Sequence, residues 1–312
     1  MTKGSIEVHH RVCHLCEAMC GLVIKTERSK VVDIRGDQDD PLSRGHVCPK
    51  AISLQDIHED PDRLRKPLKR IRTVAGEYQH EEIEWSEALD LAADALASAI
   101  QQHGIDAVGA YFGNPSVHNY GMLTHQRNLF RHIRTRNRFS ATSVDQLPHH
   151  LVSMWMFGHM LLNPIPDIDR TRYFLMLGAN PLASNGSIWT VPDVRRRIKD
   201  LTARGGKLVV IDPRRTETAE LASEHHFIRP GTDAAFLLAI IHVLFRDSLV
   251  ALGPLANFTD GIDEVREAVQ ALTPKWGSEA TGISASEIVR IAHELAAAEA
   301  GICYGRMGVS TQ

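Results

Sequence analysis

Hydrophobic and polar positions alternate in clear blocks in the second half of the chain. Tyr173–Leu177 is an uninterrupted apolar run that stops at Gly178, and its length is typical of a buried strand. A polar helix, two further strands and an apolar helix are then predicted over residues 193–204, 207–212, 226–228 and 234–245. Strands joined through helices and short turns predict a parallel sheet with right-handed crossovers.

The first half begins with a different pattern. Residues 21–24 and 31–34 are short apolar or alternating segments on either side of a polar turn, which predicts two strands of a small β-rich unit that ends near residue 65. Residues 63–70 are expected to form a charged connector. Apolar positions then recur at helical spacing up to Gly104, with Ser86 as the predicted N-cap, and a strand is expected over residues 107–112.

These elements predict an α/β protein with three parts: a small β-rich domain over residues 1–65, the first part of an α/β domain over residues 66–140, and a Rossmann-like domain with a parallel sheet over residues 141–312. The α/β part is expected to be incomplete at its C-terminus. The chain ends in a glycine-rich strand-and-turn stretch at residues 301–312, with no helix or polar tail to close the fold.

Composition narrows the class of protein. With 312 residues, 43% of them hydrophobic and 23% charged, the chain has the composition of an ordinary globular protein. The formal net charge of −3 gives no bulk attraction to nucleic acid. No segment reaches the ~20 apolar residues of a membrane span, and the first residues lack both an apolar signal core and a twin-arginine pair. We therefore expect a cytoplasmic protein without nucleic-acid partners.

Four of the five cysteines form the most specific chemical signal. Cys13, Cys16 and Cys20 are clustered, and Cys48 follows after 27 intervening residues in Gly-His-Val-Cys-Pro-Lys. Three clustered thiolates and one distant thiolate are typical ligands of a cubane iron–sulfur cluster. Zinc also accepts four thiolates, but its sites usually consist of two CxxC knuckles. A disulfide is less favoured, because few cysteines and no signal peptide indicate a reducing compartment.

Cys303, in an apolar context, is expected to be a packed, inert thiol.

Polar and glycine residues follow the predicted strands of the second half. They are Gly178, Asn180, Asp212, Arg214, Gly231, Thr232 and Asp233. In parallel sheets, ligands bind at the carboxyl ends of the strands. Glycines allow the backbone to approach phosphate, and a carboxylate can accept hydrogen bonds from ribose or guanine. No G-x-G-x-x-G follows a strand, which argues against a nicotinamide enzyme.

The motifs in residues 12–21, 31–37 and 40–50 resemble the amino-terminal domain of the molybdopterin oxidoreductases, the superfamily of dimethyl sulfoxide reductase, nitrate reductases and formate dehydrogenases. The strand-end motifs at residues 178–181, 212–214 and 229–235 are similar to the loops that hold the guanine dinucleotide in that family. The resemblance implies a 4Fe-4S cluster at the four cysteines and molybdopterin guanine dinucleotide with molybdenum or tungsten. Lys50 matches the family's lysine between cluster and pterin.

The family's metal ligand comes from a loop before the dinucleotide domain, and here that stretch, residues 139–153, has no cysteine. Asp145, His149, His150 and Ser153 are the candidate ligands or proton carriers. As an alternative, the histidines belong to a helix cap region, and some family members leave the metal without a protein ligand.

The resemblance implies an oxidoreductase that exchanges two electrons with a small-molecule substrate and passes them singly through the cluster to a redox partner protein. Two alternatives stay open: an iron–sulfur electron carrier without molybdenum, and a non-redox hydratase in which the metal acts as a Lewis acid. Members of this family continue well beyond the length of this chain. We therefore expect an amino-terminal piece that is inactive alone: either a truncated gene product or one half of a split enzyme whose missing portion is a separate chain.

Overall fold

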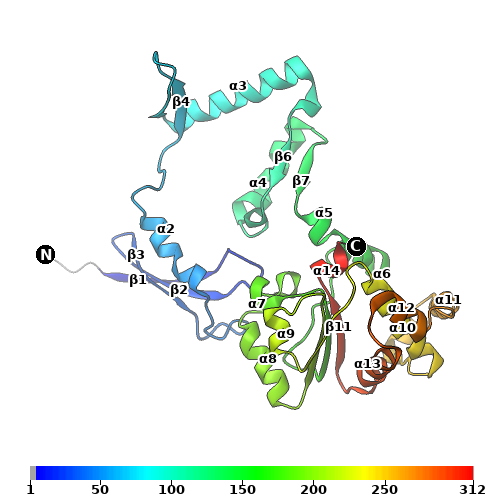
Figure 1. Cartoon of the computed structure of the whole chain (residues 1–312). Helices are drawn as coiled ribbons and strands as arrows, with labels where there is room; N and C mark the ends of the chain where they lie inside the picture. The colour runs from blue at the N-terminus through cyan, green and yellow to red at the C-terminus, as the bar shows by residue number, and fades with distance from the viewer. Residues whose placement is uncertain (1–4, 312) are drawn as a thin grey trace. The chain divides into compact units, whose positions relative to one another are not determined.

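The structure is a computed structural model that describes residues 5–311. It consists of two compact units, with the boundary between Ala141 and Thr142. Figure 1 shows the elements of both units along the chain.

The first unit begins with a three-stranded antiparallel sheet of β1 (Ile6–Val12), β2 (Gly21–Glu27) and β3 (Lys30–Gly36), in that order (Figure 1). Two short helices follow, α1 (Pro49–Ile52) and α2 (Leu54–Glu59). The two predicted strands are confirmed, whereas β1 was not predicted because it is mostly polar and exposed. The small core includes Cys13, Cys20, Leu22 and Ile34.

In the rest of the first unit, three predictions made from the sequence are wrong. The elements are β4 (Leu68–Arg72), β5 (Tyr78–Glu82), α3 (Trp85–His103), η1 (Ile105–Ala107), β6 (Ala110–Phe112), η2 (Asn114–Val117), α4 (Tyr120–Ile133) and β7 (Arg138–Ser140). The expected connector at residues 63–70 runs into β4, which pairs with β5 in an antiparallel hairpin. The N-cap of α3 is Glu84 and not Ser86. The strand expected from residue 107 starts only at Ala110, because a 3₁₀ turn comes first.

A four-stranded parallel sheet forms the centre of the second unit. Its strands are β8 (Tyr173–Leu177), β9 (Lys207–Ile211), β10 (Glu224–His226) and β11 (Gly301–Gly305), in the order β10-β9-β8-β11. The predicted parallel sheet is confirmed. The strand expected at residues 226–228 instead covers Glu224–His226, because its partner β9 ends at Ile211, opposite His226. Cys303 is exposed on the edge strand β11, so it is not packed as expected. The surrounding protein nevertheless raises the pKa of its thiol to about 11, as an inert thiol requires.

Helices cover both faces of this sheet (Figure 1). One face carries α10 (Asp233–Arg246), α12 (Pro274–Thr281) and α13 (Ala285–Ala297); the other carries α7 (Pro181–Ser184), α8 (Val194–Ala203) and α9 (Glu217–Leu221). Leu175 and Leu177 belong to the first core, and Phe174 and Met176 to the second. Burial on both faces explains why β8 is apolar at every position.

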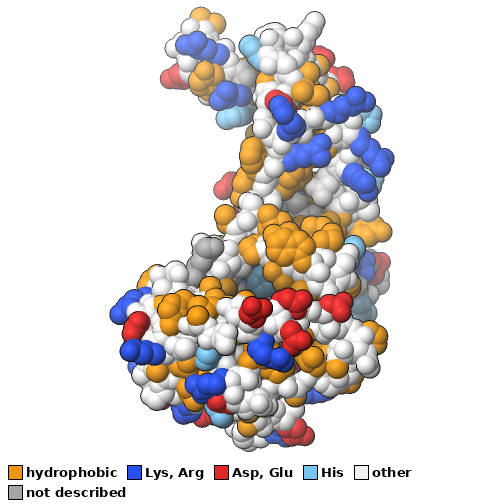
Figure 2. Space-filling view, turned by 90° about the vertical axis from the view of Figure 1, so that its right-hand side faces the viewer, with side chains coloured by type: hydrophobic (Ala, Val, Ile, Leu, Met, Phe, Trp, Pro, Cys, Tyr) orange, Lys and Arg blue, Asp and Glu red, His pale blue; other side chains and the backbone are white. Residues whose placement is uncertain are grey.

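Shorter elements complete the second unit: α5 (Thr142–Asp145), α6 (Leu147–Phe157), η3 (Ser187–Trp189), η4 (Gly253–Asn257), α11 (Ile262–Ala268) and α14 (Met307–Ser310). Helix α6 is rich in apolar residues, yet Trp155 and Met156 are 74% and 68% exposed. Figure 2 shows hydrophobic side chains gathered on the face turned toward the viewer. A helix that is apolar all round is usually covered by other polypeptide. Among residues 5–311, no helix is long and apolar enough to span a membrane.

Candidate functional site

The four candidate cluster cysteines belong to the small core beside the antiparallel sheet. Cys13 directly follows β1 and Cys20 directly precedes β2. The amide of Cys13 donates to the carbonyl of Cys20 across 2.9 Å, and the amide of Met19 donates to the carbonyl of Cys16 across 3.2 Å. These bonds fold the loop between the strands. Cys48 packs against the same core as the N-cap residue of α1. The fold therefore gathers the three clustered thiols and the distant one.

The thiols interact electrostatically. Burial, together with smaller contributions from the neighbouring Cys13, Cys16 and Cys48, raises the pKa of Cys20 to about 12. Burial also raises the pKa of Cys13, with smaller contributions from Cys16 and Cys48. Four thiolates this close repel one another unless a cation compensates them, and bound iron supplies that compensation. The donor set fits an iron–sulfur cluster.

The spacing of the sulfur atoms bears on the zinc alternative. Within residues 5–311, no three of these sulfurs lie within 4.8 Å of one another. Thiolates around a single zinc ion would be only about 4 Å apart, given Zn–S bonds near 2.3 Å. These thiols therefore form no preformed single-ion zinc site. Lys50, on α1 two residues after Cys48, is exposed.

A second candidate site is a cavity of about 390 Å³ in the second unit. It lies at the carboxyl ends of β8, β9 and β11, as the parallel topology predicts for a ligand site. Its walls comprise Asp145, Gly178, Ala179, Asn180, Ala183, Ser184, Asp212, Arg214, Thr216, Arg306 and Met307. The structure thus brings together Gly178, Asn180, Asp212, Arg214 and Asp145, which sequence reasoning had selected from separate segments.

Asp212 is the most deeply buried carboxylate of this cavity, at 8% exposure. One of its oxygens accepts a hydrogen bond from the Arg214 amide at 2.8 Å. Burial nevertheless raises its pKa, because water no longer solvates the charge. A ligand that donates hydrogen bonds to this carboxylate would offset that cost, as a guanine or ribose does. The site therefore fits a nucleotide.

Asn180 is fixed at the end of β8. Its amide nitrogen donates to Glu217 Oε2 at 2.7 Å, and its Oδ1 accepts from the Thr218 hydroxyl at 2.7 Å. Gly231, Thr232 and Asp233 do not line the cavity. They form the turn into α10, where Asp233 is buried close enough to Asp212 for the two charges to interact.

Arg306, at the end of β11, was missed from the sequence. It is 5% exposed and contacts Asp145 twice, through its Nη1 to the backbone carbonyl at 3.0 Å and its Nη2 to Oδ1 at 2.5 Å. The sequence did contain a signal for Arg306, because it is a charged residue directly after an apolar strand, the same pattern that identified Asp212. This ion pair holds the candidate metal-ligand segment against the strand ends.

The other candidate ligands are held differently. Nε2 of His149 donates to the Gly305 carbonyl at 3.0 Å, and its Nδ1 accepts from the Ser310 hydroxyl at 3.4 Å. Burial lowers the pKa of His149, which favours this neutral ring. Ser153 is buried and donates to Asn163 at 2.7 Å. His150 is half-buried on α6. Of the four candidates, Asp145 alone lines the cavity.

Two glycines touch at the cavity, of which Gly178 lines it. Gly178 has a φ of +55°, and a Cβ atom there would lie 2.7 Å from Gly308 Cα. A Cβ atom on Gly308 would in turn lie 2.8 Å from Gly178 Cα. The Gly308 amide donates to the Gly178 carbonyl at 3.0 Å. Direct backbone contact of this kind excludes any side chain at either position.

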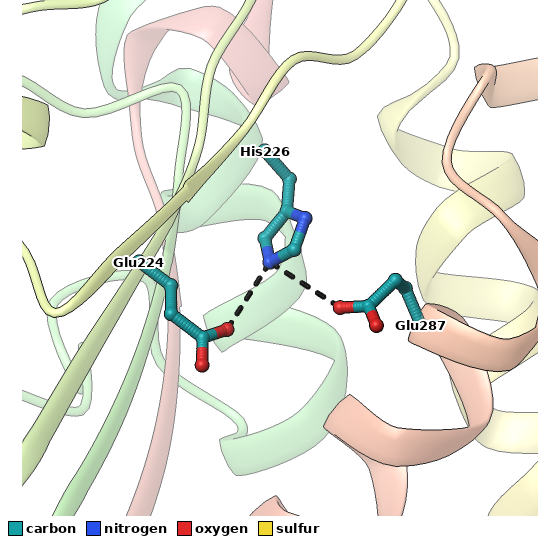
Figure 3. Close-up of side chains that lie close together, drawn as sticks. All are labelled: Glu224, His226 and Glu287. Carbon is teal, nitrogen blue, oxygen red and sulfur yellow. Dashed lines mark hydrogen bonds and ion pairs between the residues drawn. The ribbon is translucent and has the colours of Figure 1, made fainter.

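A third group of polar side chains lies between β9, β10 and α13. Ligand atoms of Glu224, His226 and Glu287 lie within 4.8 Å of one another (Figure 3). Lys207 and Arg290, however, already pair with Glu224 at 2.5 and 2.6 Å, and Arg290 pairs with Glu287 at 2.5 Å. Since the protein's own cations neutralise these carboxylates, the group is an ion-pair network that ties α13 to the sheet.

This network predicts acid sensitivity. Partial burial of Glu224 raises its pKa, but hydrogen bonds from Lys207, Arg290 and His226 outweigh burial and lower the pKa to about 2. A depressed carboxyl pKa stabilises the fold above the unfolded value near 4.5, and that contribution disappears as pH falls from there toward 2. Glu224→Gln should therefore lower the free energy of unfolding at pH 7 by on the order of 1 kcal/mol.

Urea denaturation at pH 7 and pH 3 measures this effect. The difference between wild type and Glu224→Gln should shrink at the lower pH. Glu267→Gln, an exposed carboxylate on α11, is the control and should match wild type at both values. Equal stability of both variants at pH 7 would show that the network contributes nothing.

Comparison with known proteins identifies relatives of both units. Residues 6–59 match the family model of the molybdopterin oxidoreductase Fe4S4 domain, and residues 63–275 match that of molybdopterin oxidoreductase. The first match favours the cluster over the zinc alternative.

Individual relatives agree with these matches. The chain is 30% identical over 287 residues to the probable oxidoreductase YoaE of Bacillus subtilis, which covers 90% of this chain and 40% of YoaE. It is 29% identical over 307 residues to formate dehydrogenase H of Escherichia coli, covering 96% and 41% of the two chains. For the thiosulfate reductase molybdopterin-containing subunit PhsA of Salmonella typhimurium, the identity is 28% over 297 residues, with 95% and 37% covered.

A solved structure is also similar. Acetylene hydratase from Pelobacter acetylenicus superimposes with a TM-score of 0.78 at 26% identity, over 96% of this chain and 40% of that chain. The chain thus spans about two fifths of the length of the relatives it matches.

Proposed function

Because the chain belongs to the molybdopterin oxidoreductase family and includes its Fe4S4 domain, we propose that it supplies the iron–sulfur centre and part of the guanine dinucleotide site of a molybdenum or tungsten oxidoreductase. The observation that carries this proposal is the cavity at the strand ends, where Asn180, Asp212 and Arg214 meet within the matched family region. When bound, the metal and its pterin supply the two-electron redox chemistry.

The residues of this chain have separate roles in the proposal. Cys13, Cys16, Cys20 and Cys48 hold the cluster. Asp212 accepts hydrogen bonds from the nucleotide, and Arg214, which is exposed at the cavity, neutralises phosphate charge. Asp145 is the best placed candidate for the protein ligand to the metal, because Arg306 holds its Oδ1 at the cavity wall. Lys50 is proposed to lie on the electron path next to the cluster.

Partners follow from the family. The relatives are longer than the part of them that this chain matches. We therefore propose that the complete activity belongs to a protein that also includes an equivalent of the rest of these relatives. That portion would also cover the apolar surface of α6. A redox partner protein would exchange electrons with the cluster. Formate and thiosulfate, named in two relatives, are the first substrates to test.

Metal analysis and turnover test the proposal. The protein, produced anaerobically together with such a remaining portion, should contain molybdenum or tungsten in addition to iron. It should exchange electrons between a substrate and a dye such as a viologen. Iron without molybdenum or tungsten in every preparation would favour a simple electron carrier and would contradict the proposal.

The similarity to acetylene hydratase supports a second candidate, a non-redox hydratase of the same family. The two activities differ in their need for electrons. A hydratase would convert acetylene with no external electron acceptor or donor in the reaction, whereas the proposed oxidoreductase would give no net turnover under that condition.

A further inference from the structure

The residue directly after a cluster cysteine is held by a neighbouring loop. Gly21 follows Cys20 at the start of β2. Its amide donates to the Ser43 hydroxyl at 3.1 Å, and its carbonyl accepts from the Asp37 amide at 2.9 Å. Both polar backbone groups of Gly21 are therefore bonded to the segment that leads from β3 to Cys48.

Asp40 determines the direction of these hydrogen bonds. Its Oδ2 accepts from both the amide and the hydroxyl of Ser43, each at 2.6 Å. Ser43 is 3% exposed, and a hydroxyl has only one proton to donate. Because that proton goes to Asp40, the Ser43 oxygen can only accept from Gly21. The chain of bonds runs from amide to hydroxyl to carboxylate, and charge strengthens its last step.

The contact between Asp40 and Gly21 is also tight. A Cβ atom on Gly21 would lie 2.6 Å from Asp40 Cβ and 2.8 Å from its Cγ. Two further hydrogen bonds order the loop that leads from Asp40 to Cys48. The Arg44 amide donates to the Asp40 carbonyl at 2.8 Å, and the His46 amide donates to the Ser43 carbonyl at 2.9 Å. Asp40 thus connects the backbone beside Cys20 to the loop that carries the fourth cysteine.

We infer that Asp40 is a positioning residue of the iron–sulfur site, which, through Ser43, fixes the loop of Cys48 against the backbone that follows Cys20. The inference rests on the proposed cluster. It has two consequences that can be separated. The hydrogen bonds keep the ligands in place, so their loss should release iron. The carboxylate charge disfavours addition of an electron nearby, so its loss should raise the midpoint potential of the cluster.

Two substitutions separate these consequences. Asp40→Ala removes both the acceptor and the charge, whereas Asp40→Asn keeps an oxygen that can accept from Ser43 and removes only the charge. Ser43→Ala removes the hydroxyl alone. The control is Asp39→Ala, an exposed carboxylate in the same turn. The measurements are the rate of iron loss to a chelator, the electron paramagnetic resonance spectrum of the reduced cluster, and its midpoint potential.

We expect Asp40→Ala and Ser43→Ala to lose iron about tenfold faster than wild type, and Asp39→Ala to behave as wild type. Asp40→Asn should retain iron and show a positive shift in midpoint potential. If Asp40→Ala does not fold, iron loss from Ser43→Ala decides: loss faster than wild type supports the inference, and loss at the wild-type rate overturns it. Equal iron loss from Asp40→Ala and Asp39→Ala would also overturn it. Wild-type protein without iron and sulfide would instead contradict the proposed function.

Discussion

Cys20→Ala should lose most of the about four irons and four sulfides per chain that we expect in anaerobically purified wild-type protein. Cys20 is one of the two most buried of the four thiols. Its pKa, raised to about 12 by burial and by the other cysteines, shows how strongly this thiolate depends on a bound cation. Removing one of four ligands exposes an iron to solvent and weakens the core that surrounds the cluster. Iron and acid-labile sulfide analysis measure the loss.

Cys303→Ala is the matched control. This thiol is exposed on β11 in the second unit, so its removal should leave iron and sulfide unchanged. One tightly bound zinc ion and no labile sulfide in the wild-type preparation would contradict the cluster assignment.

Asp212→Ala should reduce the guanine dinucleotide content of the purified holoprotein about tenfold, because hydrogen bonds to a charged acceptor contribute roughly 1.5–3 kcal/mol. Asp212 lies at the carboxyl end of β9, is buried, and has its pKa raised by that burial. Burial disfavours its charge, and hydrogen bonds donated by a nucleotide would offset that cost. The nucleotide released by denaturation, separated by chromatography, gives the content.

Asp200→Ala provides the comparison for this experiment. Asp200 is an exposed carboxylate on α8, paired loosely with Arg196 at 3.8 Å. Its substitution should leave nucleotide content at the wild-type level. If both variants retain the same amount, the nucleotide does not bind at the end of β9.

Patterns of apolar residues predicted the central sheet well. Tyr173–Leu177 forms β8 with the expected bounds, because a strand buried on both faces is apolar at every position. Because the predicted strands are parallel, the sequence alone placed Asn180, Asp212 and Arg214 at one edge of the sheet. The same reasoning did not reach Arg306, although it follows β11 in the same way.

Exposed elements were harder to predict. The β4–β5 hairpin is made of mostly charged and polar residues and has no buried face, so it gave no alternation to detect. The start of α3 was misplaced because Ser86 is a residue type favoured at N-caps and Glu84 is not, although Glu84 adopts the extended cap conformation. The Asp40, Ser43 and Gly21 contacts depend on a loop conformation that residue spacing alone does not determine.

The glycine pair at the cavity limits how this protein can diverge. Because Gly178 and Gly308 touch through their backbones, no mutation at either position can add a group that reaches a ligand without separating β8 from α14. Variation in what the cavity accepts must therefore arise on its walls, at side chains such as Asn180, Arg214 and Met307. Natural variants or laboratory libraries that change cofactor or substrate preference should accumulate replacements there and keep both glycines.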